Sequence, residues 1–172
     1  MEVRPLPIHE ESEEQDRASD WEGQELAPGA RGHMATFARA LAQSCLASGV
    51  QVVLGPGTPW PHQAISSGMP APLAVDVVDL MVPSDCVVVP AERMPSPSAR
   101  AAARAWEADR LLVAPALFGR EVLAVGLAPV GRDIRPDQRA VVAAGRRLAS
   151  ALAAWSAELG GTAVDERGAA PA

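Results

Sequence analysis

Early in the chain, apolar residues recur every three or four positions, which is the spacing of one helical face. The residues concerned are Met34, Phe37, Leu41 and Cys45. This pattern predicts a helix that begins near His33, and Gly49 is suited to end it. Two strands are predicted next, over 50–54 and around 63–66, with a loop rich in proline and glycine between them.

The middle of the chain alternates between helical and extended patterns. Residues 73–81 carry apolar side chains at helical spacing, and Pro83 ends that segment. A short buried strand is predicted over 86–89. Ser96 followed by proline is typical of an N-cap and a first helical turn, and it opens an alanine-rich helix that runs to about Glu107.

Two apolar runs, over 110–117 and 121–127, are joined by a glycine-containing turn and predict a β-hairpin. The last helix begins near Pro136, and Gly160-Gly161 is expected to end it. The order is therefore helix, two strands, helix, strand, helix, hairpin, helix. It indicates an α+β fold, with an antiparallel sheet and the terminal helices packed on one face.

Negative charge is concentrated at the start of the sequence, where residues 1–32 contain nine carboxylates and three arginines. Such a polar segment, interrupted by proline and glycine, buries too little apolar surface to offset its chain entropy. We therefore expect a disordered acidic segment over 1–32, a folded domain over 33–160 and a disordered segment over 161–172. The acidic segment serves solubility, or docks to a partner with Trp21 as its anchor.

Composition excludes several classes of function. Residues 33–172 contain twelve acidic and twelve basic residues, so we expect no basic patch of the kind that nucleic-acid binding requires. All fifteen basic residues are arginine, which excludes Schiff-base and lysine general-base chemistry. No apolar run suits a membrane span or a secretory signal. Two cysteines are too few for a disulfide scaffold or a structural zinc site, so we expect a cytoplasmic protein with reduced thiols.

The stretch from Trp106 to Trp155 resembles the C-terminal half of a GAF domain. That family has a strand ending in a (V)PL-like element, a turn, a GVLAL strand, a helix start and an alanine- and leucine-rich helix. The matching segments here are 112–115, 122–127, 134–137 and 148–152. Upstream, AVDVVDLMVPSDCVVVPAE resembles the family's preceding helix, turn and strand. The resemblance covers about residues 33–158, and it departs from the family pattern at Ala116-Leu117 and in a short, proline-rich 50–66 region.

The resemblance implies a non-catalytic sensory or regulatory domain that binds a small molecule or a protein partner, although a fold does not by itself define a function. It also implies a homodimer through the terminal helices, whose apolar stripes then exceed what the sheet needs. Those stripes contain Met34, Phe37, Leu41, Leu148, Leu152 and Trp155. The alternative is a monomer in which the helices only cover the sheet. The sequence contains no NKFDE-type cyclic-nucleotide motif and no cysteine followed by histidine for a bilin, so the cofactor is unknown.

Four side chains are candidates to line a cleft: Trp60, His62, Trp106 and Arg110. His62 is either a haem or metal ligand or a solvated loop residue, and Trp106 either borders the cleft or packs in the core. No spacing of Cys, His and Asp suggests a zinc site. We therefore predict no catalytic residue and no metal site.

Two further functions stay open. Cys45 and Cys86 would be the nucleophiles of a thiol reductase, as in the free methionine sulfoxide reductases among GAF relatives, or they are simply buried apolar residues. Neither cysteine has a cluster of His or Arg nearby in the sequence to lower its pKa. The other alternative is an adaptor of roadblock-like architecture, which would have a filled core and no ligand-sized cavity.

Overall fold

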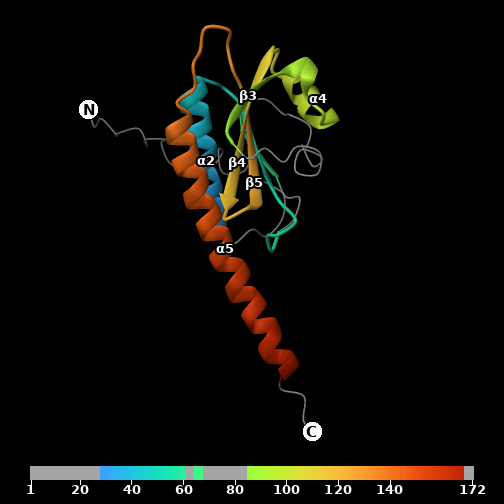
Figure 1. The fold of residues 1–172 in the computed structure, drawn as a ribbon, viewed down its shortest axis with the longest axis vertical. Coiled ribbons are helices and arrows are strands. Elements are labelled where there is room, and N and C mark those ends of the chain that lie inside the picture. Colours follow the sequence, from blue (N-terminus) through green and yellow to red (C-terminus); the bar gives the residue numbers. More distant parts are fainter. Residues whose placement is uncertain (1–27, 61–63, 68–84, 169–172) are drawn as a thin grey trace, which may run out of the picture.

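The computed structural model describes residues 28–60, 64–67 and 85–168. In this part of the chain a five-stranded sheet forms the centre of the fold, and all neighbouring strands are antiparallel (Figure 1). The strands are β1 (Val50–Leu54), β2 (Ala64–Ser67), β3 (Val87–Pro90), β4 (Arg110–Phe118) and β5 (Glu121–Pro129). Their spatial order is β2-β1-β5-β4-β3. The predicted α+β fold with an antiparallel sheet is confirmed.

Helices cover both faces of this sheet. Helices α2 (Pro28–Cys45) and α5 (Gln138–Gly168) pack together on one face, as predicted for the terminal helices. Helix α4 (Pro97–Ala105) lies on the other face and follows a short 3-10 turn, η1 (Ala91–Arg93). The sheet is therefore the middle layer of three (Figure 1).

Alternation along the strands divides the apolar residues between two cores. On β4, Leu112 and Ala114 belong to the core beneath α2 and α5, whereas Leu111 and Val113 belong to the core beneath α4. All four are at most 1% exposed. The β4–β5 hairpin is apolar on both sides because helices cover both of its faces.

A two-residue turn, Gly119-Arg120, joins β4 to β5, with Phe118 paired to Glu121. Gly119 has a φ of +63°, a conformation that costs a residue with a Cβ much more than it costs glycine. The turn therefore falls where the sequence predicted it. The ladder is irregular between Ala116 and Leu117, which is where the sequence also departs from the family pattern.

Both terminal helices extend beyond their predicted ends. Helix α2 begins at Pro28 rather than at His33, so residues 28–32 belong to the fold and not to the acidic segment. Ala30 is fully buried there, and this burial favours the extra turn. Helix α5 continues through Gly160-Gly161 to Gly168, because a glycine costs a helix interior only about 1 kcal/mol and need not end it.

The other predicted elements are close to those observed. The strand expected around 63–66 is β2, and the strand expected over 86–89 is β3. Ser96 caps α4 as predicted, since its Oγ accepts a hydrogen bond from the Ala99 backbone N–H at 3.0 Å. The helix predicted over 73–81 and the disorder predicted over 1–27 and 169–172 lie outside the described residues.

Candidate functional site

A cleft of about 430 Å³ lies at the end of the sheet where β4 begins and β5 ends. We call it the first cleft. Three chain segments form its walls: 45–48 after α2, 106–109 after α4, and 129–134 after β5. Clefts of this volume are within the range of small-molecule sites.

Two walls of the first cleft contain strained backbone. Leu46 and Glu107 have φ values of 50° and 52°, and they are the non-glycine residues with positive φ in the described part of the chain. Each follows a helix: the Ala47 N–H donates to the Ala42 carbonyl at 2.9 Å, and the Ala108 N–H donates to the Ala103 carbonyl at 2.8 Å. Most helices place glycine at such a position, so the cleft acquires side chains where a glycine would supply none.

Arg110, the first residue of β4, holds the third wall (129–134) in place through hydrogen bonds. Its guanidinium Nη2 donates to the backbone carbonyls of Gly131, of Arg132 at 3.1 Å and of Ile134 at 3.5 Å. The Val130 N–H in turn donates to the Arg110 carbonyl at 3.0 Å. Arg110, which the sequence predicted to line a cleft, does not line the first cleft but holds the loop that forms one of its walls.

A second cleft, of about 470 Å³, adjoins the first and is lined by 90–92, 108–110 and Arg132. Arg132 pairs with Asp109 at 2.9 Å between Nη2 and Oδ2, and both residues line both clefts. Their side chains are 84% and 64% exposed, so this ion pair is weak and easily rearranged. The pair therefore contributes to the lining of both clefts.

Trp106 lies between the first cleft and the core beneath α4. Its backbone forms the C-cap of α4, with the N–H donating to Ala102 at 2.9 Å. The indole packs against the core beneath α4. Its Nε1 is buried and has no hydrogen-bond partner in the described part of the chain. A Cβ at Gly49 would lie 2.7 Å from that nitrogen, so glycine is required there. Trp106 therefore lines the first cleft and also packs against the core beneath α4, and a role in binding stays a prediction.

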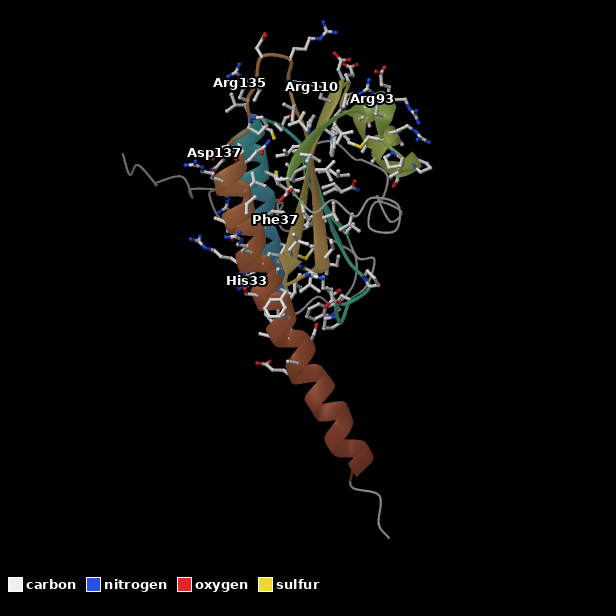
Figure 2. All side chains as sticks on the ribbon, in the orientation of Figure 1. His33, Phe37, Arg93, Arg110, Arg135 and Asp137 are labelled. Carbon is white, nitrogen blue, oxygen red and sulfur yellow. The ribbon has the colours of Figure 1, made fainter. Side chains whose placement is uncertain are left out.

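The remaining predicted site residues do not join this group. Trp60 lies at the opposite end of the sheet and packs edge-to-face on Trp155, with ring centroids 6.1 Å apart. His62 lies outside the described residues. Figure 2 shows Arg110 at the α4 end of the molecule and His33, which also contacts Trp155 edge-to-face, well down the helical layer.

The two thiols are buried and close to each other. Cys45 is 2% exposed and Cys86 is 7% exposed, and both belong to the core beneath α2 and α5. Burial raises the pKa of Cys45 to about 12, with a further contribution from nearby Cys86. Burial, with Asp85 nearby, raises the pKa of Cys86 to about 11. At neutral pH both are protonated thiols, which are poor nucleophiles.

Sequence reasoning missed most of the cleft. Leu46 and Glu107 have no sequence signal, because positive φ is associated with glycine and asparagine. Asp109 and Arg132 are far apart in the chain and meet only through the pairing of β4 with β5. The family resemblance identified the strands but not these loop residues.

Neither a family model nor a curated protein matches the sequence. Among solved structures, the chain is similar to a domain assigned to a two-component sensor histidine kinase from Sinorhizobium meliloti 1021. The two share 15% identity and a TM-score of 0.54, over 79% of this chain and 97% of that one. This similarity and the strand order define the architecture. The fold is GAF-like.

Two structures named as GAF domains are also found. The GAF domain/HD domain protein from Geobacter sulfurreducens has 16% identity and a TM-score of 0.48, over 74% of this chain and 93% of that one. The PixJ GAF domain from Thermosynechococcus elongatus has 13% identity and a TM-score of 0.40, over 85% and 97%. At these identities and TM-scores, neither structure indicates a ligand or an activity for this chain.

The described residues lack two further features. They contain no group of three or more His, Cys, Asp or Glu side chains placed to hold a metal ion. Within the same residues, no helix combines the length and the apolar character needed to cross a bilayer.

Proposed function

We propose that this chain is a non-catalytic sensory or regulatory domain that binds a small molecule in the first cleft. The observation that carries the proposal is the construction of that cleft. Strained turns at Leu46 and Glu107 form two walls, and the loop held by Arg110 forms the third. Backbone strain of this kind is more common at functional sites than elsewhere. The likeness in fold to a domain of a sensor histidine kinase supports a sensory role.

The lining of the cleft suggests the class of ligand. Apolar surface comes from Leu46, Ala47 and Trp106, and charge comes from the Asp109–Arg132 pair at the rim. A small organic molecule with a flat apolar body and one polar end fits this combination. The ligand would displace or extend the exposed ion pair.

The alternatives have less support. The thiol reductase needs a thiolate, whereas burial keeps both cysteines protonated at neutral pH. The roadblock-like adaptor predicts no ligand-sized cavity, whereas the described residues line two adjoining open clefts of about this size. A protein partner that docks at the same end of the sheet is the second candidate function, because exposed Leu46, at 77%, is an apolar contact at the rim.

The homodimer stays a prediction. The sequence predicted that the apolar stripes of the terminal helices exceed what is needed to cover the sheet. Five of these six residues are instead buried within one chain, at 0–1% exposure: Met34, Phe37, Leu41, Leu148 and Leu152. They cover the sheet. A dimer through α2 and α5 would therefore use the outer faces of these helices.

Native mass spectrometry of the full chain, purified from the organism that makes it, tests the proposal. We expect a mass increment of a few hundred daltons that is released on denaturation. Ser48→Trp places a large side chain from an exposed position into the first cleft, and should reduce the occupied fraction at least tenfold. The matched control is Ser150→Trp, at an exposed position on α5, which should retain the increment.

Two results would contradict small-molecule binding in the first cleft. One is the absence of any increment in the wild-type chain. The other is equal retention of the increment by Ser48→Trp and Ser150→Trp. A wild-type chain with no increment that captures one protein in stoichiometric amount, and loses it on Ser48→Trp substitution, would favour the protein partner.

A further inference from the structure

The outer surface of the two terminal helices carries charge of one sign. Within α2, and within α5 as far as Ala157, the sequence contains no Asp or Glu. The same segments contain Arg31, Arg39, Arg139, Arg146 and Arg147. Four of these arginines are exposed, and Arg31 is half-buried. We call this surface the arginine face.

Antiparallel packing spreads these charges along the whole helical layer. The C-terminal end of α2 meets the start of α5, where Ser44 Oγ donates to the Asp137 carbonyl at 3.4 Å. Phe37 lies beside Gly145 near the middle, and His33 contacts Trp155 edge-to-face, with ring centroids 5.8 Å apart, towards the other end. Figure 2 shows Asp137, Phe37 and His33 in this order along the layer.

The arginine face has few carboxylates near it in the described part of the chain. The ion pair Arg132–Asp109 lies at the end of the sheet and not on this face. Asp137, the nearest carboxylate in sequence to Arg139, accepts a hydrogen bond from the Ala140 N–H at the start of α5. Arg31 Nε is buried and has no hydrogen-bond partner among the described residues.

Residues 1–27 have the complementary charge. They contain nine carboxylates and two arginines, a net charge of −7, and they join α2 directly at Pro28. We propose that the arginine face is a docking surface for this acidic segment of the same chain. The proposal concerns a different surface from the first cleft and is independent of ligand binding there. A docked acidic segment would compete with a homodimer through the outer faces of α2 and α5.

Length and linkage both favour this occupant. A chain of 27 residues spans up to about 90 Å when extended, whereas the 18-residue helix α2 is about 27 Å long. The carboxylates can therefore reach every arginine of the face. Covalent linkage gives the segment an effective concentration in the millimolar range or above. Each exposed ion pair is weak, so docking depends on several pairs acting together and should be sensitive to salt.

Paramagnetic NMR on the full chain tests the proposal. A nitroxide is attached to Ser12→Cys in the middle of the acidic segment, and the native thiols are protected by their burial and raised pKa. At about 10 mM salt, where the screening length is about 30 Å, we expect amide signals of α2 and α5 to lose more than half their intensity. At about 1 M salt, where this length is about 3 Å, the intensity should recover.

Two triple variants test whether the acidic segment docks specifically on the arginine face or is attracted to exposed arginines anywhere on the surface. Arg139→Gln/Arg146→Gln/Arg147→Gln should abolish the low-salt broadening of α2 and α5. The matched control, Arg93→Gln/Arg104→Gln/Arg120→Gln, removes three exposed arginines outside that face and should leave the broadening unchanged. Neither set alters the first cleft, so ligand retention there reports on the proposed function separately.

Three results would overturn the proposal. The first is low-salt broadening that is absent from α2 and α5 or equally strong around α4. The second is broadening that appears in a mixture of labelled chains and isotope-enriched unlabelled chains as strongly as within one chain, which would make the occupant a second copy. The third is binding of duplex DNA that is equally tight in the wild type and in Glu10→Gln/Glu11→Gln/Glu13→Gln/Glu14→Gln, which would show a face open to polyanions.

Discussion

Gly126 on β5 illustrates how closely α2 approaches the sheet. A Cβ at this position would lie 2.9 Å from Phe37 Cε1 and would also collide with Leu41 Cδ1. Both side chains are buried, at 1% and 0% exposure. A Cβ at Gly126 would therefore force Phe37 and Leu41 to shift within a closely packed core.

We predict that Gly126→Ala lowers the free energy of unfolding by about 1–3 kcal/mol, the usual cost of overpacking a core. Gly32→Ala is the control within α2, because a Cβ there meets nothing within 4 Å. That change should raise stability by about 0.5–1 kcal/mol, since alanine loses less entropy than glycine in a helix. Denaturant titration measures both changes. Equal stability of the two variants would show that the α2–sheet contact is looser than described.

Residue by residue, the candidate site was only partly predictable. Trp106 lines the first cleft and Arg110 lines the second, and each is a bulky polar or aromatic residue at the boundary of a predicted element, so their role in binding stays a prediction. Trp60 instead packs on Trp155, since proximity in the sequence to a proline-rich loop says nothing about which end of the sheet that loop reaches. Leu46 and Asp109 had no sequence signal at all.

At the level of elements, the Ser96 N-cap of α4 is a sequence motif whose contribution to the free energy of unfolding can be measured. Ser96 is fully buried, and its Oγ accepts the Ala99 N–H. Without this oxygen, a backbone donor in the first turn loses its partner in a site that water does not easily reach.

We predict that Ser96→Ala lowers the free energy of unfolding by about 0.5–2 kcal/mol and speeds hydrogen exchange at the Ala99 amide. Ser150→Ala, at an exposed position on α5, removes the same atom where no cap depends on it and should be neutral or slightly stabilising. The measurement is denaturant unfolding with amide exchange followed by NMR. Identical exchange at Ala99 in the wild type and in Ser96→Ala would argue against the cap.

Element type was more predictable than element length. The period of apolar residues identified α2, the β4–β5 hairpin and α5, since each buries a regular face. The ends of the terminal helices were wrong, because glycine and proline signals near them are weak compared with tertiary packing at Ala30 and with helix propagation through Gly160-Gly161.

At the scale of the whole molecule, composition gives an unusual alkaline titration. The chain has no lysine and no tyrosine, so Cys45 and Cys86 are the side chains that titrate between about pH 8 and pH 12. In the folded state burial raises their pKa values to about 12 and about 11. Unfolding exposes both thiols, which then ionise near their ordinary pKa of about 8.5.

Above about pH 8.5 the unfolded state therefore holds fewer protons than the folded state, and stability must fall as the pH rises towards 11. Below that pH the thiols contribute no slope, because they are protonated in both states. We predict that Cys45→Ala/Cys86→Ala has a flatter dependence of unfolding free energy on pH between 9 and 11 than the wild type. Denaturant titrations in reducing buffer measure this slope. Parallel curves would show that the folded thiols ionise normally.

The sequence by itself determined the α+β class, the hairpin with its glycine turn and the two helices on one face. These follow from local periodicity and turn chemistry, which are properties of neighbouring residues. The uneven distribution of carboxylates was equally visible in the sequence.

Only the tertiary structure decided where the chemistry gathers. Strand pairing brings Asp109 to Arg132, and the order β2-β1-β5-β4-β3 separates Trp60 from Trp106 and Arg110. Residues 33–172 have balanced charge along the sequence, yet the packing of α2 on α5 collects arginines on one surface. A linear pattern reports which face of an element is buried, whereas the neighbours across that face depend on long-range packing, and those neighbours form both the cleft and the arginine face.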